Sequence, residues 1–206
     1  IECSGISMKY LGEDLDIHCG GIDAACPHHT NEIAQTESFL GHKWCNYWFH
    51  VHHLNTADDS GKSEKMSKSK GEFLTVSLLE SKGYDPMAYR LFCLQSHYRR
   101  NLVFSWENLD NAVTAYNKLI AKIATFKNDG EVDQEAFNKL KERFVGALNG
   151  DLNTSLAVTA VYDVLKAKCN DATKLALLKD FDTVLSLNLI SAAEKLAAKQ
   201  AAEEAA

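Results

Sequence analysis

The sequence lacks the features that mark a membrane-bound or secreted protein. It has no run of about 18 apolar residues, which is the length that a membrane-spanning helix needs. Its opening residues, IECSGISMKY, have neither the charged start nor the apolar centre of a signal peptide. They also lack an initiator methionine, and we therefore expect the chain to be a fragment of a longer protein.

The chain also lacks internal repeats and an excess of basic residues. Without a fixed-period repeat, its 206 residues predict one large domain or two small ones. Lysine and arginine number 22 against 28 aspartates and glutamates, which gives a net charge of -6. This balance excludes a chain built mainly as a cation for nucleic acid, so any contact with RNA should be local.

The six cysteines lack the context of a disulfide framework. They are widely spread and follow no secretory signal, so we expect reduced thiols in the cytoplasm. Four of the six, and four of the eight histidines, nevertheless gather near the N-terminus, at Cys3, Cys19, Cys26, Cys45, His18, His28, His29 and His42. This gathering favours a metal site in the first half of the chain.

The first 75 residues have the pattern of a strand, a helix and a second strand. DLDIHCGG (14–21) is typical of a short strand that ends at a Gly-Gly turn. Pro27 then stands where the first turn of a helix accepts proline, and HHTNEIAQTESFLG continues that helix. The aromatic stretch NYWFHVHHL (46–54) predicts the next strand, and the polar residues 56–71 predict a loop. This order predicts a parallel sheet, in which ligands lie at the carboxyl ends of the strands.

From about residue 75 the pattern becomes helical. Asp85-Pro86 begins one helix, Ser105 can cap the next, and Asn153 or Thr154 can cap a later one. Apolar residues recur at steps of three and four, as in the core of a helical bundle. The inward-facing positions expected from this spacing are Val113, Tyr116, Leu119, Ile120, Ile123, Phe126, Phe137, Leu140, Phe144, Leu148, Leu156, Val161, Tyr162, Leu165, Leu175, Leu178, Phe181, Val184 and Leu185. The predicted fold class is therefore α/β followed by all-α.

The stretch PHHTNE (27–32) carries a candidate metal site. His28 and Glu32 are four residues apart, so on a helix their side chains share one face. Cys3 could add a thiolate from elsewhere in the fold, and a Cys/His/Glu set suits zinc. By spacing alone, a surface pair is an alternative for His28 and Glu32, and Cys19, Cys26 and His29 are rival ligands.

The stretch EKMSKSKG (64–71) places three lysines and two serines beside a glycine. Its hydroxyl and backbone N–H groups can donate to oxyanions, and its lysines can follow a moving phosphate. A solvated linker is the alternative that composition alone favours.

Several motifs now coincide in order: IECS (1–4), DIHCGGID (16–23), PHHTNE (27–32), NYWFH (46–50), KMSKS (65–69), HYR (97–99) and GDLNT (150–154). Over roughly residues 1–190 the chain resembles the cysteinyl-tRNA synthetases, a family of class I aminoacyl-tRNA synthetases. KMSKS alone is typical of class I synthetases in general, whereas IECS and PHHxNE together are far more specific.

The resemblance implies a zinc ion held by two cysteines, one histidine and one glutamate. Three matching positions are present, namely Cys3, His28 and Glu32. The resemblance places the other cysteine, and the His-x-Gly-His motif that holds ATP, upstream of this chain. Such a zinc would select cysteine over serine, because a thiol ionises and bonds to the ion whereas a hydroxyl does not.

The resemblance also divides the chain into three parts. Residues 1–75 would be the second half of a Rossmann-type catalytic domain with the KMSKS loop. Residues 76–104 would be connecting helices that contact the tRNA stem, and residues 105–206 a truncated helical bundle on the anticodon side. We expect a cytoplasmic monomer, with no membrane contact, and a chain that is inactive alone because half of the nucleotide site is missing.

The reaction that the resemblance implies joins L-cysteine to AMP, with ATP and Mg²⁺, and then passes the cysteinyl group to tRNA(Cys). Lys65 and Lys68 would stabilise the charge that develops on the phosphates. Gly20 and Gly21 would let the backbone approach the nucleotide, and Asp23 would accept from ribose hydroxyls; Lys68 would also contact ATP.

Two departures from the family pattern and two other functions remain open. Cys19 stands where a glycine is expected and Cys26 where an aromatic residue is usual. The nearest alternative function is a ligase that joins cysteine to an amino sugar, as in mycothiol synthesis, which needs no tRNA. A non-catalytic zinc or RNA-binding module is an alternative from another class.

Overall fold

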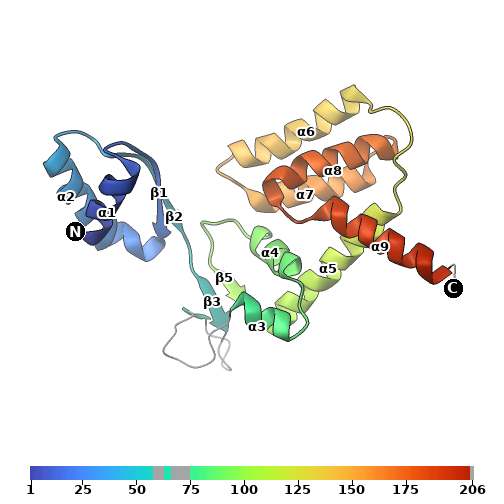
Figure 1. Cartoon of the computed structure of the whole chain (residues 1–206), viewed down its shortest axis with the longest axis horizontal. Coiled ribbons are helices and arrows are strands. Elements are labelled where there is room, and N and C mark those ends of the chain that lie inside the picture. The colour runs from blue at the N-terminus through green and yellow to red at the C-terminus, as the bar shows by residue number, and fades with distance from the viewer. Residues whose placement is uncertain (58–62, 66–74, 205–206) are drawn as a thin grey trace. The chain divides into compact units, whose positions relative to one another are not determined.

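The computed structural model describes residues 1–57, 63–65 and 75–204 (Figure 1). Its backbone contacts divide the chain into two compact units. The first comprises Ile1–Met66 and Tyr98–Val103, and the second comprises Ser67–His97 and Phe104–Ala206. Among the described residues, no helix is long and apolar enough to cross a membrane.

The first unit is built on two parallel strands and the helices around them. In chain order its elements are α1 (Glu2–Leu11), β1 (Leu15–Gly21), the short turns η1 (Ile22–Ala24) and η2 (Ala25–His29), α2 (Thr30–Leu40) and β2 (Cys45–Val51). The two strands pair in parallel from Leu15↔Cys45 to Gly21↔Val51. The predicted order of strand, helix and parallel strand is therefore confirmed.

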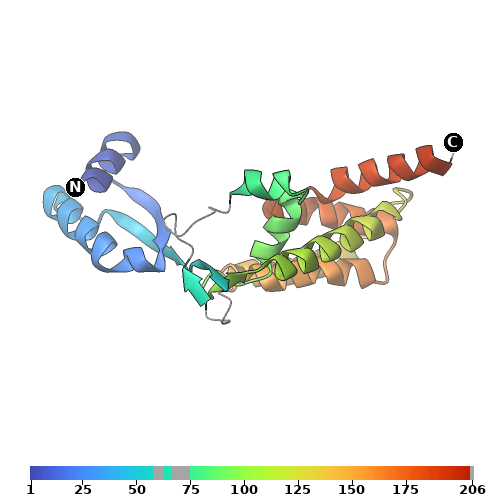
Figure 2. The same cartoon turned by 90° about the horizontal axis from the view of Figure 1, so that it is seen from below.

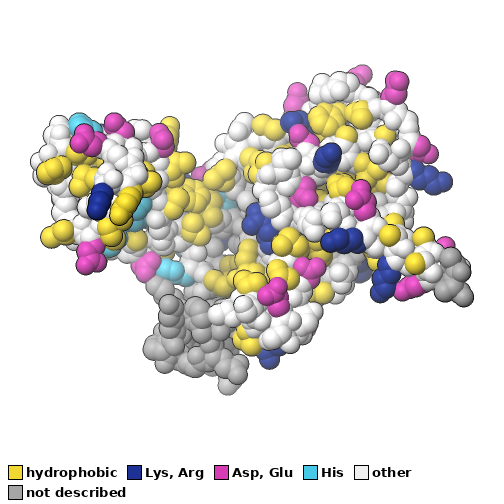
Figure 3. All heavy atoms as spheres, in the orientation of Figure 1, with side chains coloured by type: hydrophobic (Ala, Val, Ile, Leu, Met, Phe, Trp, Pro, Cys, Tyr) yellow, Lys and Arg dark blue, Asp and Glu magenta, His cyan; other side chains and the backbone are white. Residues whose placement is uncertain are grey.

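One face of the β1–β2 layer packs against the start of α2, and the other face exposes large apolar side chains. Side chains alternate along a strand, and His18 on β1 and Trp48 on β2 both contact His29 at the start of α2. On the opposite face, Ile17 and Tyr47 stand in register and are 59% and 71% exposed. Figure 3 shows hydrophobic side chains gathered on the surface of this unit. A parallel sheet normally has both faces covered, so these two strands have the character of part of a larger sheet.

The segment after β2 forms a second, small sheet instead of a long strand and loop. The predicted strand 46–54 ends at Val51, and the His52 N–H donates to the Tyr98 carbonyl at 2.9 Å. The chain then forms β3 (Leu54–Ala57), β4 (Ser63–Lys65) and β5 (Leu102–Phe104), in the order β4-β3-β5. The prediction of a loop over 56–71 was thus wrong at Thr56, Ala57 and 63–65. Backbone pairing needs no apolar pattern, and short polar strands are common at sheet edges.

The second unit is helical, as predicted, and Figures 1 and 2 show its helices α5 to α9 packed side by side. Its helices are α3 (Val76–Ser81), α4 (Pro86–Leu94), α5 (Trp106–Ala124), α6 (Gln134–Asn149), α7 (Thr154–Lys166), α8 (Asp171–Leu185) and α9 (Leu189–Glu204). Helix α6 packs on α7 and α8, while α5 packs on α4 and α9. Contacts therefore group the connecting helices α3 and α4 with the bundle, while the three-part functional division of the chain stays a prediction.

Side-chain caps fix the starts of these helices. The residue before the helix accepts a hydrogen bond from a first-turn N–H in six of them, at Thr75, Asp85, Ser105, Asp133, Asn153 and Asn170. The caps expected at Ser105 and at the Asp85-Pro86 pair are confirmed, and of the two candidates for α7 the cap is Asn153. Each such cap stabilises its helix by about 1 kcal/mol.

The core of the second unit follows the apolar stripes, with two exceptions. Tyr116, Ile123 and Phe181 are fully buried, and the Phe144 and Phe181 rings stack at 4.0 Å. Leu156 and Val184 were expected inside but are 54% and 52% exposed. Leu156 lies in the first turn of α7, and α8 turns Phe181 and Leu185 inward so that Val184 falls outside the buried face.

Candidate metal and nucleotide site

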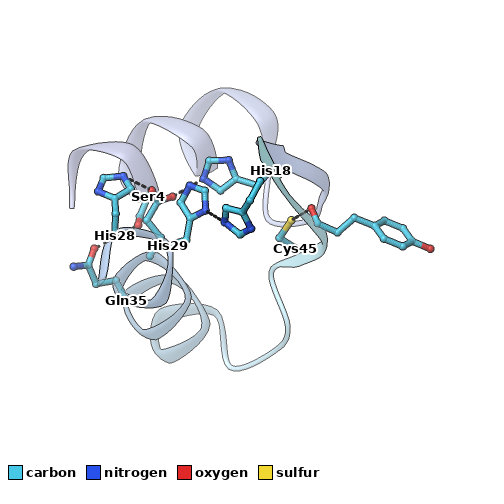
Figure 4. Close-up of polar contacts among 9 residues, drawn as sticks. Ser4, His18, His28, His29, Gln35 and Cys45 are labelled. Atoms are coloured by element: carbon cyan, nitrogen blue, oxygen red, sulfur yellow. Dashed lines mark hydrogen bonds and ion pairs between the residues drawn. The ribbon is translucent and has the colours of Figure 1, made fainter. Parts of the chain in front are cut away.

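The three predicted metal ligands come together in the first unit. Cys3 lies in the first turn of α1, His28 in η2, and Glu32 in the first turn of α2. Their ligand atoms all lie within 4.8 Å of one another. The four-residue step brings His28 Nε2 to 2.7 Å from Glu32 Oε1. Ser4 Oγ donates to Gln35 Oε1 at 3.4 Å, a contact that holds α1 against α2 (Figure 4).

Glu32 is the buried centre of this cluster. Only 3% of the residue is exposed, and its Oε2 lies 2.7 Å from His18 Nε2 on β1. Its Oε1 is close to His28 but makes no hydrogen bond of acceptable geometry among the described residues. A buried carboxylate oxygen without a hydrogen bond is costly unless a cation balances it. The arrangement therefore fits a metal ion on the Oε1 side, where Cys3 and His28 lie.

A layer of histidines continues from Glu32 into the sheet. Figure 4 shows His18, His28 and His29 grouped together, and His29 Nδ1 lies 2.8 Å from His50 Nε2 on β2. Burial lowers the pKa of His29, the neighbouring His18 lowers it further, and the Glu32 carboxylate opposes them. The lowered pKa favours the neutral form of His29 at pH 7, in which one ring nitrogen can accept a hydrogen bond.

The three rival ligands named from the sequence, Cys19, Cys26 and His29, differ in whether they belong to a group of possible metal ligands. Among the described residues, His29 joins a second group with His18 and Glu32, whereas Cys19 and Cys26 join neither group. His18 Nε2 already stands at hydrogen-bonding distance from Glu32 Oε2, so we interpret His18 as the residue that orients Glu32. Sequence reasoning missed this role. No local spacing signals it, because His18 and Glu32 are 14 residues apart in the chain.

The residues expected at the nucleotide lie at the carboxyl end of β1. A Cβ on Gly20 would stand 2.6 Å from His29 Cε1, and one on Gly21 would stand 2.5 Å from Asp23 Oδ1. The buried His29 ring thus requires a glycine at position 20, whereas at position 21 the close atom is the end of the exposed Asp23 side chain, which can move. The approach of a nucleotide to these glycines stays a prediction. Asp23 itself is 56% exposed in its side chain, with Oδ1 at 3.4 Å from His53 Nε2. Its carboxylate is therefore accessible to a ligand at the end of the strand.

Of the two predicted catalytic lysines, Lys65 lies within the described residues and Lys68 does not. Lys65 is the last residue of β4, and its backbone stands opposite Asn55 of β3. Lys68, predicted for both catalysis and ATP binding, lies outside the described residues. The roles of both lysines stay predictions.

A cavity adjoins the metal cluster. Its volume is about 370 Å³, which is within the range of pockets that hold small molecules. It is lined by Ile1, Glu2, Cys3, His28, Asn31, Glu32 and Gln35. The candidate ligands therefore border a space in which a small thiol could reach them.

Comparison with known proteins identifies the family. The model of the family described as "tRNA synthetases class I (C) catalytic domain" matches residues 1–114, which is more than half of the chain. The chain belongs to this family.

Curated relatives agree with this assignment. The chain is 44% identical over 189 residues to "Cysteine–tRNA ligase 1" of Burkholderia lata, a match that covers 92% of the chain and 38% of the relative. It is 42% identical to "Cysteine–tRNA ligase" of Novosphingobium aromaticivorans, over 92% of the chain and 40% of that protein. A relative of the same name from Thermococcus gammatolerans is 41% identical over 81% of the chain and 37% of its own length. The chain thus spans about two fifths of the length of these relatives.

Two solved structures share the fold at low sequence identity. The LeuRS–tRNA–LeuAMS complex of Agrobacterium radiobacter K84 matches with a TM-score of 0.55 at 16% identity, over 89% of this chain and 27% of that one. Methionyl-tRNA synthetase of Mycobacterium tuberculosis, bound by methionyl-adenylate, matches with a TM-score of 0.50 at 19% identity, over 86% of this chain and 40% of that one. These likenesses support the α/β-then-helical architecture predicted from the sequence.

Proposed function

We propose that this chain is part of an enzyme that activates L-cysteine with ATP and transfers the cysteinyl group to tRNA(Cys). The observation that carries the proposal is the cluster of Cys3, His28 and Glu32 beside a cavity, in a chain of the class I (C) catalytic family. The proposed setting is a cytoplasmic monomer, and the proposed co-substrate is ATP with Mg²⁺.

Recognition of cysteine would rest on the metal cluster. Cys3, His28 and Glu32 would hold a zinc ion together with a fourth ligand, and the ion, when bound, supplies a Lewis acid that favours a thiolate over a hydroxyl. Glu32 is held for this task by its burial and by His18 on the far side of its carboxylate. His29 and His50 contact each other next to this cluster, and they would limit the access of water to it.

The nucleotide would lie at the carboxyl end of β1. The exposed Asp23 carboxylate would accept from ribose hydroxyls there, next to the close backbone at Gly20 and Gly21. Lys65 and Lys68 would stabilise the charge that builds on the α-phosphate and the leaving pyrophosphate, more in the transition state than in the ground state.

The amino-sugar ligase is a weaker candidate, because relatives that match 92% of this chain are named as cysteine–tRNA ligases. The two candidate functions differ in the molecule that receives the cysteinyl group, which is an amino sugar in one and tRNA in the other. The test follows the cysteinyl group. With the complete gene product, radiolabelled cysteine and ATP, label should appear in acid-precipitable tRNA, and Lys68→Ala should remove most of it.

Two outcomes would contradict the proposal. Cysteine-dependent release of pyrophosphate without label in tRNA would favour the sugar ligase. Failure of both reactions, in a preparation that is folded and loaded with zinc, would indicate a binding module that lacks the chemistry.

A further inference from the structure

Two consecutive histidines, His52 and His53, lie between β2 and β3, and the proposed function gives them no role. The His52 N–H donates to the Tyr98 carbonyl at 2.9 Å, and the Leu102 N–H donates to the His53 carbonyl at 3.3 Å. The His52 ring adds a further contact, with Nδ1 at 3.1 Å from Asn101 Oδ1. All of these residues belong to the first unit. The backbone at both histidines is therefore fixed by contacts within that unit.

The His53 side chain lies at the carboxyl end of β1. Its Nε2 atom is 3.4 Å from Asp23 Oδ1. A Cβ on Gly21, the last residue of β1, would stand 3.2 Å from His53 Cε1, so the ring lies against the backbone of that glycine. The His53 side chain is 25% exposed, whereas that of Asp23 is 56% exposed. The imidazole is thus the more firmly held member of the pair.

The Asp23 carboxylate gains from a support of this kind if it is to bind a ligand. Asp23 lies in η1, a single short turn, with more than half of its side chain exposed. An exposed side chain samples several rotamers, and fixing one of them on binding costs conformational entropy. A neighbour that already holds the carboxylate removes part of this cost. The His53 ring is placed to do so, because its own position is set by Gly21 and by the backbone contacts of the first unit.

We propose that His53 is a positioning residue for the nucleotide, which holds the Asp23 carboxylate in the orientation that accepts from the ribose hydroxyls. The proposal rests on the proposed function, because it takes Asp23 as the group that binds the ribose. Ligands of parallel α/β sheets lie beyond the carboxyl ends of the strands, and Gly21, Asp23 and His53 meet at that end of β1. His53 acts through Asp23 and needs no contact of its own with the nucleotide.

The test compares three single variants in the complete gene product. His53→Leu removes the ring nitrogens, whereas His53→Gln keeps an N–H donor on a side chain of similar reach. His42→Leu is the matched control, because His42 is an exposed histidine before the start of β2, and its Nδ1 contacts the neighbouring Lys43 carbonyl at 2.9 Å. Cysteine-dependent ATP–pyrophosphate exchange gives KM for ATP and KM for cysteine, and the zinc content of each variant is measured beside them.

The proposal predicts that His53→Leu raises KM for ATP by at least about threefold, in line with the loss of one polar contact to a charged group. KM for cysteine and the zinc content should stay at the wild-type values, since the candidate zinc ligands and the cavity beside them do not include His53. His53→Gln should raise KM for ATP less than His53→Leu does, and His42→Leu should leave it unchanged. An unchanged KM for ATP in His53→Leu, or an equal rise in KM for cysteine, would overturn the proposal.

A double-mutant cycle distinguishes positioning from direct contact with the nucleotide. If His53 acts through the Asp23 carboxylate, His53→Leu should raise KM for ATP no further in a protein that already carries Asp23→Asn. The same fold-rise in both backgrounds would show that His53 acts on the nucleotide independently of Asp23, and would overturn the proposal.

Direct binding separates failure of this inference from failure of the proposed function. If the wild-type protein shows no cysteine-dependent exchange of pyrophosphate, the proposed function fails, and the dissociation constants of ATP and 2′-deoxy-ATP from equilibrium dialysis decide the role of His53. His53→Leu should weaken the binding of ATP and reduce the preference for ATP over 2′-deoxy-ATP. Equal weakening of both nucleotides, or no binding of ATP by the wild-type protein, would overturn the inference.

Discussion

Glu32 is a buried carboxylate whose two oxygens face different imidazoles. Its Oε2 is satisfied by His18, while its Oε1 faces His28 and Cys3 without a hydrogen bond among the described residues. This burial argues against the surface ion pair that spacing alone allowed, and the role of Glu32 as a metal ligand stays a prediction. The surface alternative requires an exposed glutamate, and Glu32 is 3% exposed.

At this residue we predict that Glu32→Gln lowers the affinity for zinc by more than about tenfold, because the variant removes the anionic oxygen from the cluster. The measurement is competition against a chromophoric chelator in the complete gene product. Glu37→Gln is the matched control on the same helix, since the Gln amide can still accept from the Trp44 N–H that Glu37 binds. Equal zinc affinity in the two variants would contradict the assignment.

Tyr116 gives a prediction about alkaline pH. Burial raises its pKa to about 12, and the nearby Asp85 and Asp182 add to this effect. The folded pKa is thus above the unfolded value of about 10, so the unfolded state releases the proton first as pH rises. The stabilising contribution is complete below pH 10 and is lost between pH 10 and 12.

The matching variant is Tyr116→Phe, which loses the hydrogen bond from the phenol to the Leu187 carbonyl at 2.8 Å. We expect it to be less stable at pH 8 by about 1 kcal/mol, and to lose less stability than wild type between pH 9 and 11. Urea unfolding at several pH values measures this difference. Parallel loss in both proteins would show that Tyr116 does not carry the effect.

At the scale of elements, the helices could be predicted more fully than the strands. Helix starts depend on short-range signals, and Ser105 and the Asp85-Pro86 pair give such signals in the sequence itself. The step from His28 to Glu32 is equally local, so the shared face of these two residues was predictable. Strand pairing depends on distant partners, which is why the end of β2 at Val51 and the strand at 63–65 were not predicted.

Dependence on distant partners also explains why the role of His18 at the candidate site was not predicted. His18 contacts Glu32 only because β1 pairs in parallel with β2 and α2 folds back over them. No local spacing encodes that contact, since the two residues are 14 apart in the chain. The same holds for Gly20, which the packing of His29 requires in addition to its predicted place near the nucleotide. Both features depend on tertiary packing, which no local pattern in the sequence reports.

Helix packing gives a direct prediction for Phe181. Its ring is fully buried and stacks on Phe144 at 4.0 Å with an interplanar angle of 6°. Phe181→Ala should reduce the free energy of unfolding by about 3–5 kcal/mol, because it removes buried apolar area and leaves a cavity. Val184→Ala, on the exposed side of α8, should change it by less than about 0.5 kcal/mol. Urea titration monitored by helical circular dichroism makes the comparison, and similar losses in the two variants would contradict the packing.

At the scale of the whole molecule, apolar burial is unevenly divided. Of the apolar residues that are buried in the described part of the chain, only Trp44 and Cys45 lie in the first unit, and the others lie in the second. The first unit also exposes Ile17 and Tyr47 on the open face of its sheet. It therefore has less hydrophobic stabilisation of its own than the bundle has.

The uneven apolar burial predicts that backbone amides of the two units differ in their protection from hydrogen exchange. For the chain of 206 residues, amides in α5, α7 and α8 should exchange at least about tenfold more slowly than those in β1 and β2, since local stability follows the buried apolar contacts. Mass spectrometry of peptic peptides resolves the two sets. Equal protection in both would mean that the first unit is stabilised by something other than apolar burial.

The central claim is that Cys3, His28 and Glu32 hold a metal ion that binds the thiol of cysteine. The most direct measurement is X-ray absorption at the zinc edge of the complete gene product, with and without L-cysteine. The account predicts that cysteine adds one sulfur to the ligands of the ion, and that serine adds none. An unchanged sulfur count in the presence of saturating cysteine would contradict the claim.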